Sequence, residues 1–187
     1  VKVNEMFPVE TVNIGAHIML ISIAGFLISN IIRMWYFTIL KDKSLKISFV
    51  SYVTQLWQLV VHFATQIRFN KCKDKSYWIF HWVLMSGYVL MFVLIVGNLK
   101  WFQTDRIYSW YHPQRLLGYY ATFGLLIGLV FFFWGRIKKA GQKFKFSHLS
   151  DWIFIVLLLL TTLTGILLHI FRIEGMPAAT YYLYIIH

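Results

Sequence analysis

The side chains in this sequence that could do chemistry are histidines placed in long apolar stretches. Of the seven histidines, four lie within or at the edge of such a stretch: His17, His81, His169 and His187. An ionisable side chain inside a membrane is costly and usually functional. Imidazole is also one of the few side chains that can hold a haem iron from within a helical bundle. One such histidine serves equally well to hydrogen-bond a neighbouring helix. Four in one small chain favour a haem site.

A six-coordinate haem b needs two axial ligands at one depth on facing helices. For one haem the sequence offers His187 together with His17, His169 or Met91, and it does not choose among the three. For a second haem, His81 has no partner at its depth. We therefore expect the missing ligand roughly 18 residues beyond His187, in a continuation of the last apolar run. Since the chain begins with Val1 and stops inside that run, we expect it to be part of a longer protein.

The composition indicates a membrane protein. Hydrophobic residues make up 59% of the 187 residues, charged residues make up 13%, and the mean hydropathy is +0.63. Several charge-free stretches reach the ~20 residues that cross a hydrocarbon core. Unbroken apolar runs indicate helices, because the strands of membrane barrels alternate in polarity. The sequence thus predicts an all-α, polytopic bundle forming a single domain over residues 1–187.

We expect four complete spans, the start of a fifth, and one helix at the membrane surface. The spans are expected at residues 11–40, 77–99, 115–134 and 149–171, and the fifth begins near residue 178. In residues 46–68, polar side chains recur at helical spacing, which is typical of an amphipathic helix at the interface or against a partner. That this segment crosses the membrane is the less favoured alternative, since lysine clusters would then face opposite sides.

Two local features bear on packing. Gly124 and Gly128 in the third span either let a helix approach closely or make room for a flat cofactor. Ser147 is expected to cap the fourth span, with Asp151 in its first turn. Of the remaining histidines, His62 and His148 lie near the ends of apolar segments, where solvated or lipid-facing roles are expected.

The net charge of +11 reflects basic residues at the ends of spans rather than a nucleic-acid surface. With the N-terminus outside, five basic residues fall on the outer side: Lys2, Lys100, Arg106, Arg115 and Arg172. The other thirteen fall on the inner side: Arg33, Lys41, Lys43, Lys46, Arg68, Lys71, Lys73, Lys75, Arg136, Lys138, Lys139, Lys143 and Lys145. This bias predicts an outside N-terminus. A single cysteine, Cys72, cannot ligate an iron–sulfur cluster, so any cluster would belong to a partner.

The pattern of spans resembles a known family. His81 lies in the stretch FHWVLMSGYVLMF (residues 80–92) of the second span, and His187 enters the fifth apolar run. These features resemble the membrane cytochrome b family that includes the gamma subunit of respiratory nitrate reductase and the membrane subunit of heterodisulfide reductase. In the nitrate-reductase branch a second histidine follows on this span, where the present sequence has Met91. The stretch TGILLHIFRIEG (residues 164–175) is more similar to the heterodisulfide-reductase branch.

The resemblance implies a subunit with one or two haems b, their iron held through His81 and His187. It would carry electrons between menaquinone or another quinone and an iron–sulfur subunit on the inner side. The implied setting is a respiratory oxidoreductase complex, with its other subunits and lipids, in the prokaryotic cytoplasmic membrane. The resemblance also implies a quinone site near the outer haem, at His169, Arg172, Arg115 and His112. For the two arginines, pairing with lipid headgroups is an equal alternative.

Two other classes of function stay open. A cytochrome b subunit of the formate-dehydrogenase type would hold haem in a similar way and serve a different partner. A non-redox anchor or transporter would instead use its histidines to bind protons or to hold helices together. Transporters often show internal repeats and broken helices, and this sequence shows no internal repeat.

Overall fold

Four long apolar helices make up most of the computed structural model, which describes residues 1–41, 47–71 and 74–187. Each is long and apolar enough to cross a membrane: α1 (Val9–Trp35) continued by the π-helix η1 (Tyr36–Leu40), α4 (Lys75–Phe92) continued by the π-helix η2 (Val93–Gly97), α6 (Pro113–Ile137) and α8 (Leu149–Ile173). The described residues contain helices and no strands. The prediction of an all-α fold with four helices long and apolar enough to span a membrane is confirmed, and it agrees with a multi-pass membrane protein.

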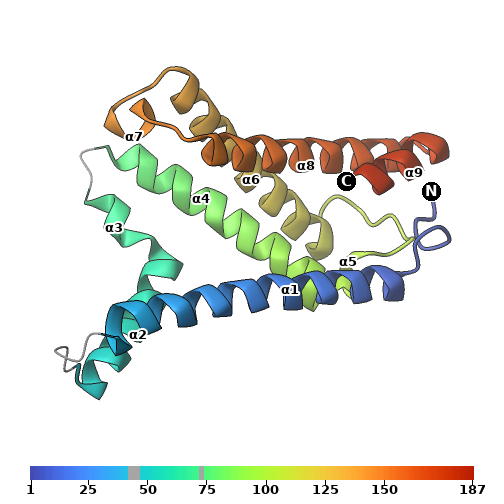
Figure 1. Ribbon diagram of the computed structural model, residues 1–187. Helices are drawn as coiled ribbons and strands as arrows, with labels where there is room; N and C mark the ends of the chain where they lie inside the picture. Colours follow the sequence, from blue (N-terminus) through green and yellow to red (C-terminus); the bar gives the residue numbers. More distant parts are fainter. Residues whose placement is uncertain (42–46, 72–73) are drawn as a thin grey trace.

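The spanning helices alternate in direction, which gives the molecule two distinct ends (Figure 1). The N-terminal segment, α5 (Leu99–Phe102) and the start of α9 (Pro177–Ile186) lie at one end, here called the network end. The end of η1, α3 (Ile67–Asn70) and α7 (Gln142–Lys145) lie at the other, here called the basic end. Because of this alternation, the described basic residues divide between the two ends of the molecule as the sequence predicts. Lys43, Lys46, Cys72 and Lys73 lie outside the described residues, and the outside location of the N-terminus stays a prediction.

Helices α4 and α6 pack with their backbones almost in contact. A Cβ atom added at Gly87 would lie 2.8 Å from the carbonyl oxygen of Ala121. One added at Gly124 would lie 3.1 Å from the carbonyl oxygen of Val83, and one at Gly128 would lie 2.6 Å from Cβ of Leu84. Small residues permit this approach in membrane helices, where packing rather than water drives association. Of the two roles predicted for Gly124 and Gly128, close helix approach is the one observed.

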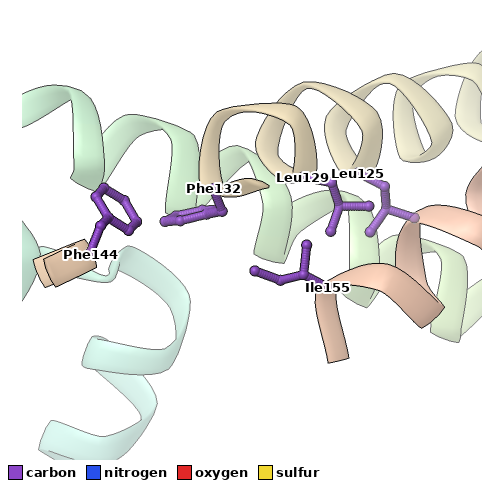
Figure 2. Packing of buried hydrophobic residues seen from close by; sticks show 5 residues of the cluster. All are labelled: Leu125, Leu129, Phe132, Phe144 and Ile155. Atoms are coloured by element: carbon purple, nitrogen blue, oxygen red, sulfur yellow. The ribbon is translucent and has the colours of Figure 1, made fainter. Parts of the chain in front are cut away.

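A small cluster of buried side chains joins α6, α7 and α8 (Figure 2). It consists of Leu125, Leu129 and Phe132 from α6, Phe144 from α7 and Ile155 from α8. The outward faces of the helices stay apolar and exposed, as Phe26 on α1 shows with 74% of its surface accessible. Such surfaces suit lipid rather than water. The fold is therefore held by a narrow central seam, while most of its apolar surface faces outward.

The segment after α1 forms α2 (Phe49–Thr65), which is not one of the four helices long enough to span. It begins after Ser48, whose hydroxyl accepts a hydrogen bond from the Ser51 amide. Its far end is tied to α4 by the indoles of Trp78 and Trp82, which donate to the Thr65 and Ala64 carbonyls at 3.0 Å. This agrees with a helix outside the bundle, while its position at the membrane surface stays a prediction.

Histidines cap two of the spanning helices. Nδ1 of His112 accepts a hydrogen bond from the Gln114 amide at the start of α6. At the start of α8, Nδ1 of His148 accepts from the Ser150 amide, and Asp151 accepts from the His148 amide. The prediction that Ser147 is the cap is wrong by one residue, because the imidazole of His148 reaches the free amides and closes a capping box.

The last helix, α9, has ten residues and packs against α8. This length is about half of what a membrane span needs. The start of a helix near residue 178 is therefore confirmed, and a fifth span stays a prediction.

We predict that Gly87→Ala destabilises the protein, because the added methyl group would meet the backbone of α6 and force the helices apart. The expected loss is about 1–3 kcal/mol of unfolding free energy, measured by denaturation of the purified protein in detergent micelles. Gly25→Ala on α1 is the matched control, since nothing lies within 4 Å of a Cβ atom there. Equal stability of the two variants would contradict the backbone contact between α4 and α6.

Candidate functional site

A chain of polar side chains lies between α6 and α8 at the network end. Nη1 of Arg115 donates to the Tyr119 hydroxyl at 3.3 Å, and this hydroxyl shares a hydrogen bond with Nε2 of His169 at 3.2 Å. The Tyr119 and His169 rings meet edge to face, with centroids 5.6 Å apart. All three residues are half-buried. An imidazole, a phenol and a guanidinium are thus connected inside the ends of two spanning helices.

Arg172 brings a second guanidinium to this site. Its Nη2 donates to the Thr104 carbonyl, whereas its Nε is buried and has no hydrogen-bond partner within the described ranges. Arg115 and the carboxylate of Asp105 lie within electrostatic reach of it. A buried N–H group without an acceptor is costly. Two guanidinium groups near the Asp105 carboxylate therefore form an electropositive site between α6, α8 and the loop that carries Thr104.

Hydrogen bonds of the Gln103 side chain connect the chain segments beside the site. Its side-chain amide donates to Oδ1 of Asn4 at 2.9 Å and to the Phe7 carbonyl at 3.1 Å, while its oxygen accepts from the Tyr184 hydroxyl at 2.9 Å. The Phe7 and Tyr184 rings stack with centroids 4.9 Å apart. These contacts join the N-terminal segment, the loop that carries Thr104, and α9.

The structure brings together three of the four residues predicted to bind quinone, namely His169, Arg172 and Arg115. His112 instead caps α6 and stacks on Tyr108, with ring centroids 4.0 Å apart. Its ring therefore stabilises the loop that leads into α6. Tyr119 was missed by the sequence analysis. Its spacing of four residues from Arg115 places both on one helix face, and this signal could have found it.

Of the predicted haem ligands, His81 has the surroundings that best fit the role. It lies near the start of α4, half-buried, among the rings of Phe69, Tyr77 and Phe132 at centroid distances of 4.7, 6.1 and 5.9 Å. An aromatic environment of this kind suits a haem iron ligand. The imidazole and its neighbours therefore fit one side of a haem site at the basic end.

His187 packs against α8. Its Cε1 atom lies 2.9 Å from the position that a Cβ atom would take at Gly165, and its Nδ1 is 3.0 Å from the Thr164 hydroxyl. His169 follows Gly165 by one turn of α8, so the ring of His187, which comes from the end of α9, and the His169 side chain lie about one turn apart along α8. Axial ligands of one haem face each other across the ring instead. In this arrangement His187 and His169 do not fit as a pair of axial ligands.

The other two predicted ligands lie apart from this pair. His17 is on the exposed surface of α1, where Nδ1 donates to the Asn13 carbonyl at 2.7 Å. It lines a groove of about 360 Å³ between α1 and the η2–α5 segment. Met91 is half-buried on α4, about 15 Å along the helix from His81. In the part of the chain that the structure describes, no three histidine, cysteine or acidic residues gather to hold a metal ion.

Comparisons of the chain with protein-family models, with curated proteins and with solved structures find no match. The resemblance to membrane cytochromes b therefore stays a prediction.

We predict that Tyr119 and His169 are energetically coupled. In a double-mutant cycle of Tyr119→Phe and His169→Ala, the coupling energy is expected to be about 1 kcal/mol, as for a typical hydrogen bond. Unfolding free energies of the four proteins in one detergent give this value. Tyr182→Phe combined with His169→Ala is the control, because Tyr182 is exposed. Additive effects in the first cycle would contradict the hydrogen bond.

Proposed function

We propose that the chain is a membrane electron-transfer subunit that binds a quinone at its network end and haem b through His81 at its basic end. The observation that most supports this is the Arg115–Tyr119–His169 hydrogen-bond chain beside Arg172. It places groups that exchange protons and groups that stabilise negative charge at the ends of two membrane-spanning helices.

A quinone site needs this combination. Oxidation of a quinol to a quinone releases two protons and two electrons, so nearby groups must hydrogen-bond the ring oxygens and accept protons. Because the Tyr119 hydroxyl accepts from Arg115, its own proton can point to Nε2 of His169, and the relay then runs from phenol to imidazole. The half-buried guanidinium of Arg172 can donate to a quinone oxygen. The surrounding helix faces are apolar and suit the ring and its tail.

The proposed haem site is at His81, near the start of α4. A haem b bound there would supply a one-electron carrier. His81 would hold the iron through its imidazole, and Phe69, Tyr77 and Phe132 would keep water from the site. The aromatic shell and the place of His81 near the end of a spanning helix support this assignment.

The proposed partner is an iron–sulfur subunit of a respiratory complex. It would dock on the basic end, which carries the described cationic residues at the helix ends of three connections: Lys41, Arg68, Lys71, Lys75, Lys138 and Lys139. Such a surface attracts an acidic partner and speeds its association. With the N-terminus outside, this end faces the cytoplasm of a prokaryotic cell, and the quinone is menaquinone or a related molecule.

A non-redox membrane anchor is the second candidate. The observation that favours it is His187, whose ring fills the space over Gly165 and hydrogen-bonds Thr164. A histidine that serves in helix packing needs no cofactor. Haem content of the purified protein separates the two candidates.

We predict that the purified chain carries haem b and that His81→Ala removes the haem it holds. The measurement is the pyridine haemochrome content per chain, with folding checked by gel filtration. His17→Ala is the control, because His17 is exposed and bonds within its own helix. A colourless, folded wild-type protein, or full haem content in His81→Ala, would contradict the assignment and leave the anchor.

A further inference from the structure

A hollow of about 570 Å³ lies at the basic end, between the end of α6, α7 and the start of α8. It is separate from the site between Arg115 and Arg172 at the opposite end. Three of its lining residues are basic: Arg136, Lys139 and Lys145. These side chains give the hollow a positive electrostatic potential, which favours the binding of an anion.

The charges around the hollow are not balanced by the described chain. Asp151 is the acidic residue that lines it, and this carboxylate accepts a hydrogen bond from the His148 amide at 3.0 Å. Arg136 is half-buried, with its guanidinium 5.8 Å from the centre of the Phe144 ring. Its Nε is buried and lacks a hydrogen-bond partner among the residues that the structure describes. A half-buried guanidinium beside two lysines is a group that phosphate oxygens match.

Exposed apolar side chains lie at and beside the hollow. Phe146 has 84% of its surface exposed and Leu149, the first residue of α8, has 69% exposed. Trp152 lines the hollow one turn into this spanning helix. These residues lie where the α6–α8 connection meets a helix that crosses the membrane, so they border the acyl chains of lipids. The ligand should therefore combine an anionic head with an apolar body.

We propose that this hollow binds the phosphate of an anionic phospholipid. Arg136, Lys139 and Lys145 surround the phosphate, while the acyl chains lie over Phe146 and Leu149. Basic pockets between membrane helices recognise anionic headgroups in this way. Free phosphate shares the head chemistry but has no part that contacts the exposed apolar side chains. The proposal goes beyond electron transfer and does not depend on it.

The test compares three additives on the delipidated full chain in neutral detergent micelles. Phosphatidylglycerol is expected to raise the unfolding temperature in a saturable way, because a ligand that binds the folded state stabilises it. Phosphatidylcholine and inorganic phosphate at equal concentration are expected to have little effect. Native mass spectrometry of the wild-type chain is expected to show retained phosphatidylglycerol.

The variant Lys139→Gln/Lys145→Gln is expected to bind phosphatidylglycerol on the order of tenfold more weakly. Lys71→Gln/Lys75→Gln is the matched control, because it removes the same charge from the same end outside the hollow. The two lysines are replaced instead of Arg136, because replacing the half-buried Arg136 could disturb folding.

Three results would overturn the proposal. Equal stabilisation by phosphatidylcholine would show that the head charge is not recognised. Equal stabilisation by inorganic phosphate would show that the ligand is a free anion. Equal weakening in the control pair would show that the whole basic end, rather than this hollow, attracts the lipid.

Discussion

The contact between α4 and α6 fixes the position of α4 against α6, the helix that contributes to both candidate sites. With Gly87 against the Ala121 carbonyl and Gly124 against the Val83 carbonyl, the two helices cannot slide without a clash. His81 lies about 9 Å along α4 from Gly87 and is thereby set against Phe132 of α6. Arg115 and Tyr119 lie at the other end of α6, where α8 supplies His169. Helix α6 therefore connects the proposed haem ligand with the proposed quinone site.

The two ends of the bundle use charge differently. At the network end, arginines are held among neutral hydrogen-bonding groups, with Gln103 joining three segments of the chain. At the basic end, three cationic side chains of the α6–α8 connection surround a hollow. Each end contains an arginine whose Nε is buried without a hydrogen-bond partner in the described ranges, Arg172 at one and Arg136 at the other. Such unsatisfied donors are unusual in folded proteins and call for a partner, which is either water or a ligand.

The spans could be predicted from the sequence because length, apolar composition and flanking charge directly reflect the thickness of a bilayer. Three of the predicted quinone-site residues also meet, since His169 and Arg172 share one helix and Arg115 begins another. Contacts that depend on side-chain reach could not be predicted in this way. His148 rather than Ser147 caps α8 because its ring reaches the free amides. His187 packs on Gly165, a pairing between α9 and α8 that spacing along the chain does not reveal.

The central claim is that electrons from a quinol at the network end reach a haem held by His81. Addition of a menaquinol analogue to the oxidised protein in lipid nanodiscs, followed by absorption spectroscopy, tests it most directly. The account predicts that the absorption bands of reduced haem b appear, and that Arg172→Gln slows their appearance while Arg106→Gln, at the same end on an exposed residue, does not. A folded protein in which quinol produces no haem signal, although dithionite does, would contradict the quinone site. Absence of the signal with either reductant would contradict the account as a whole.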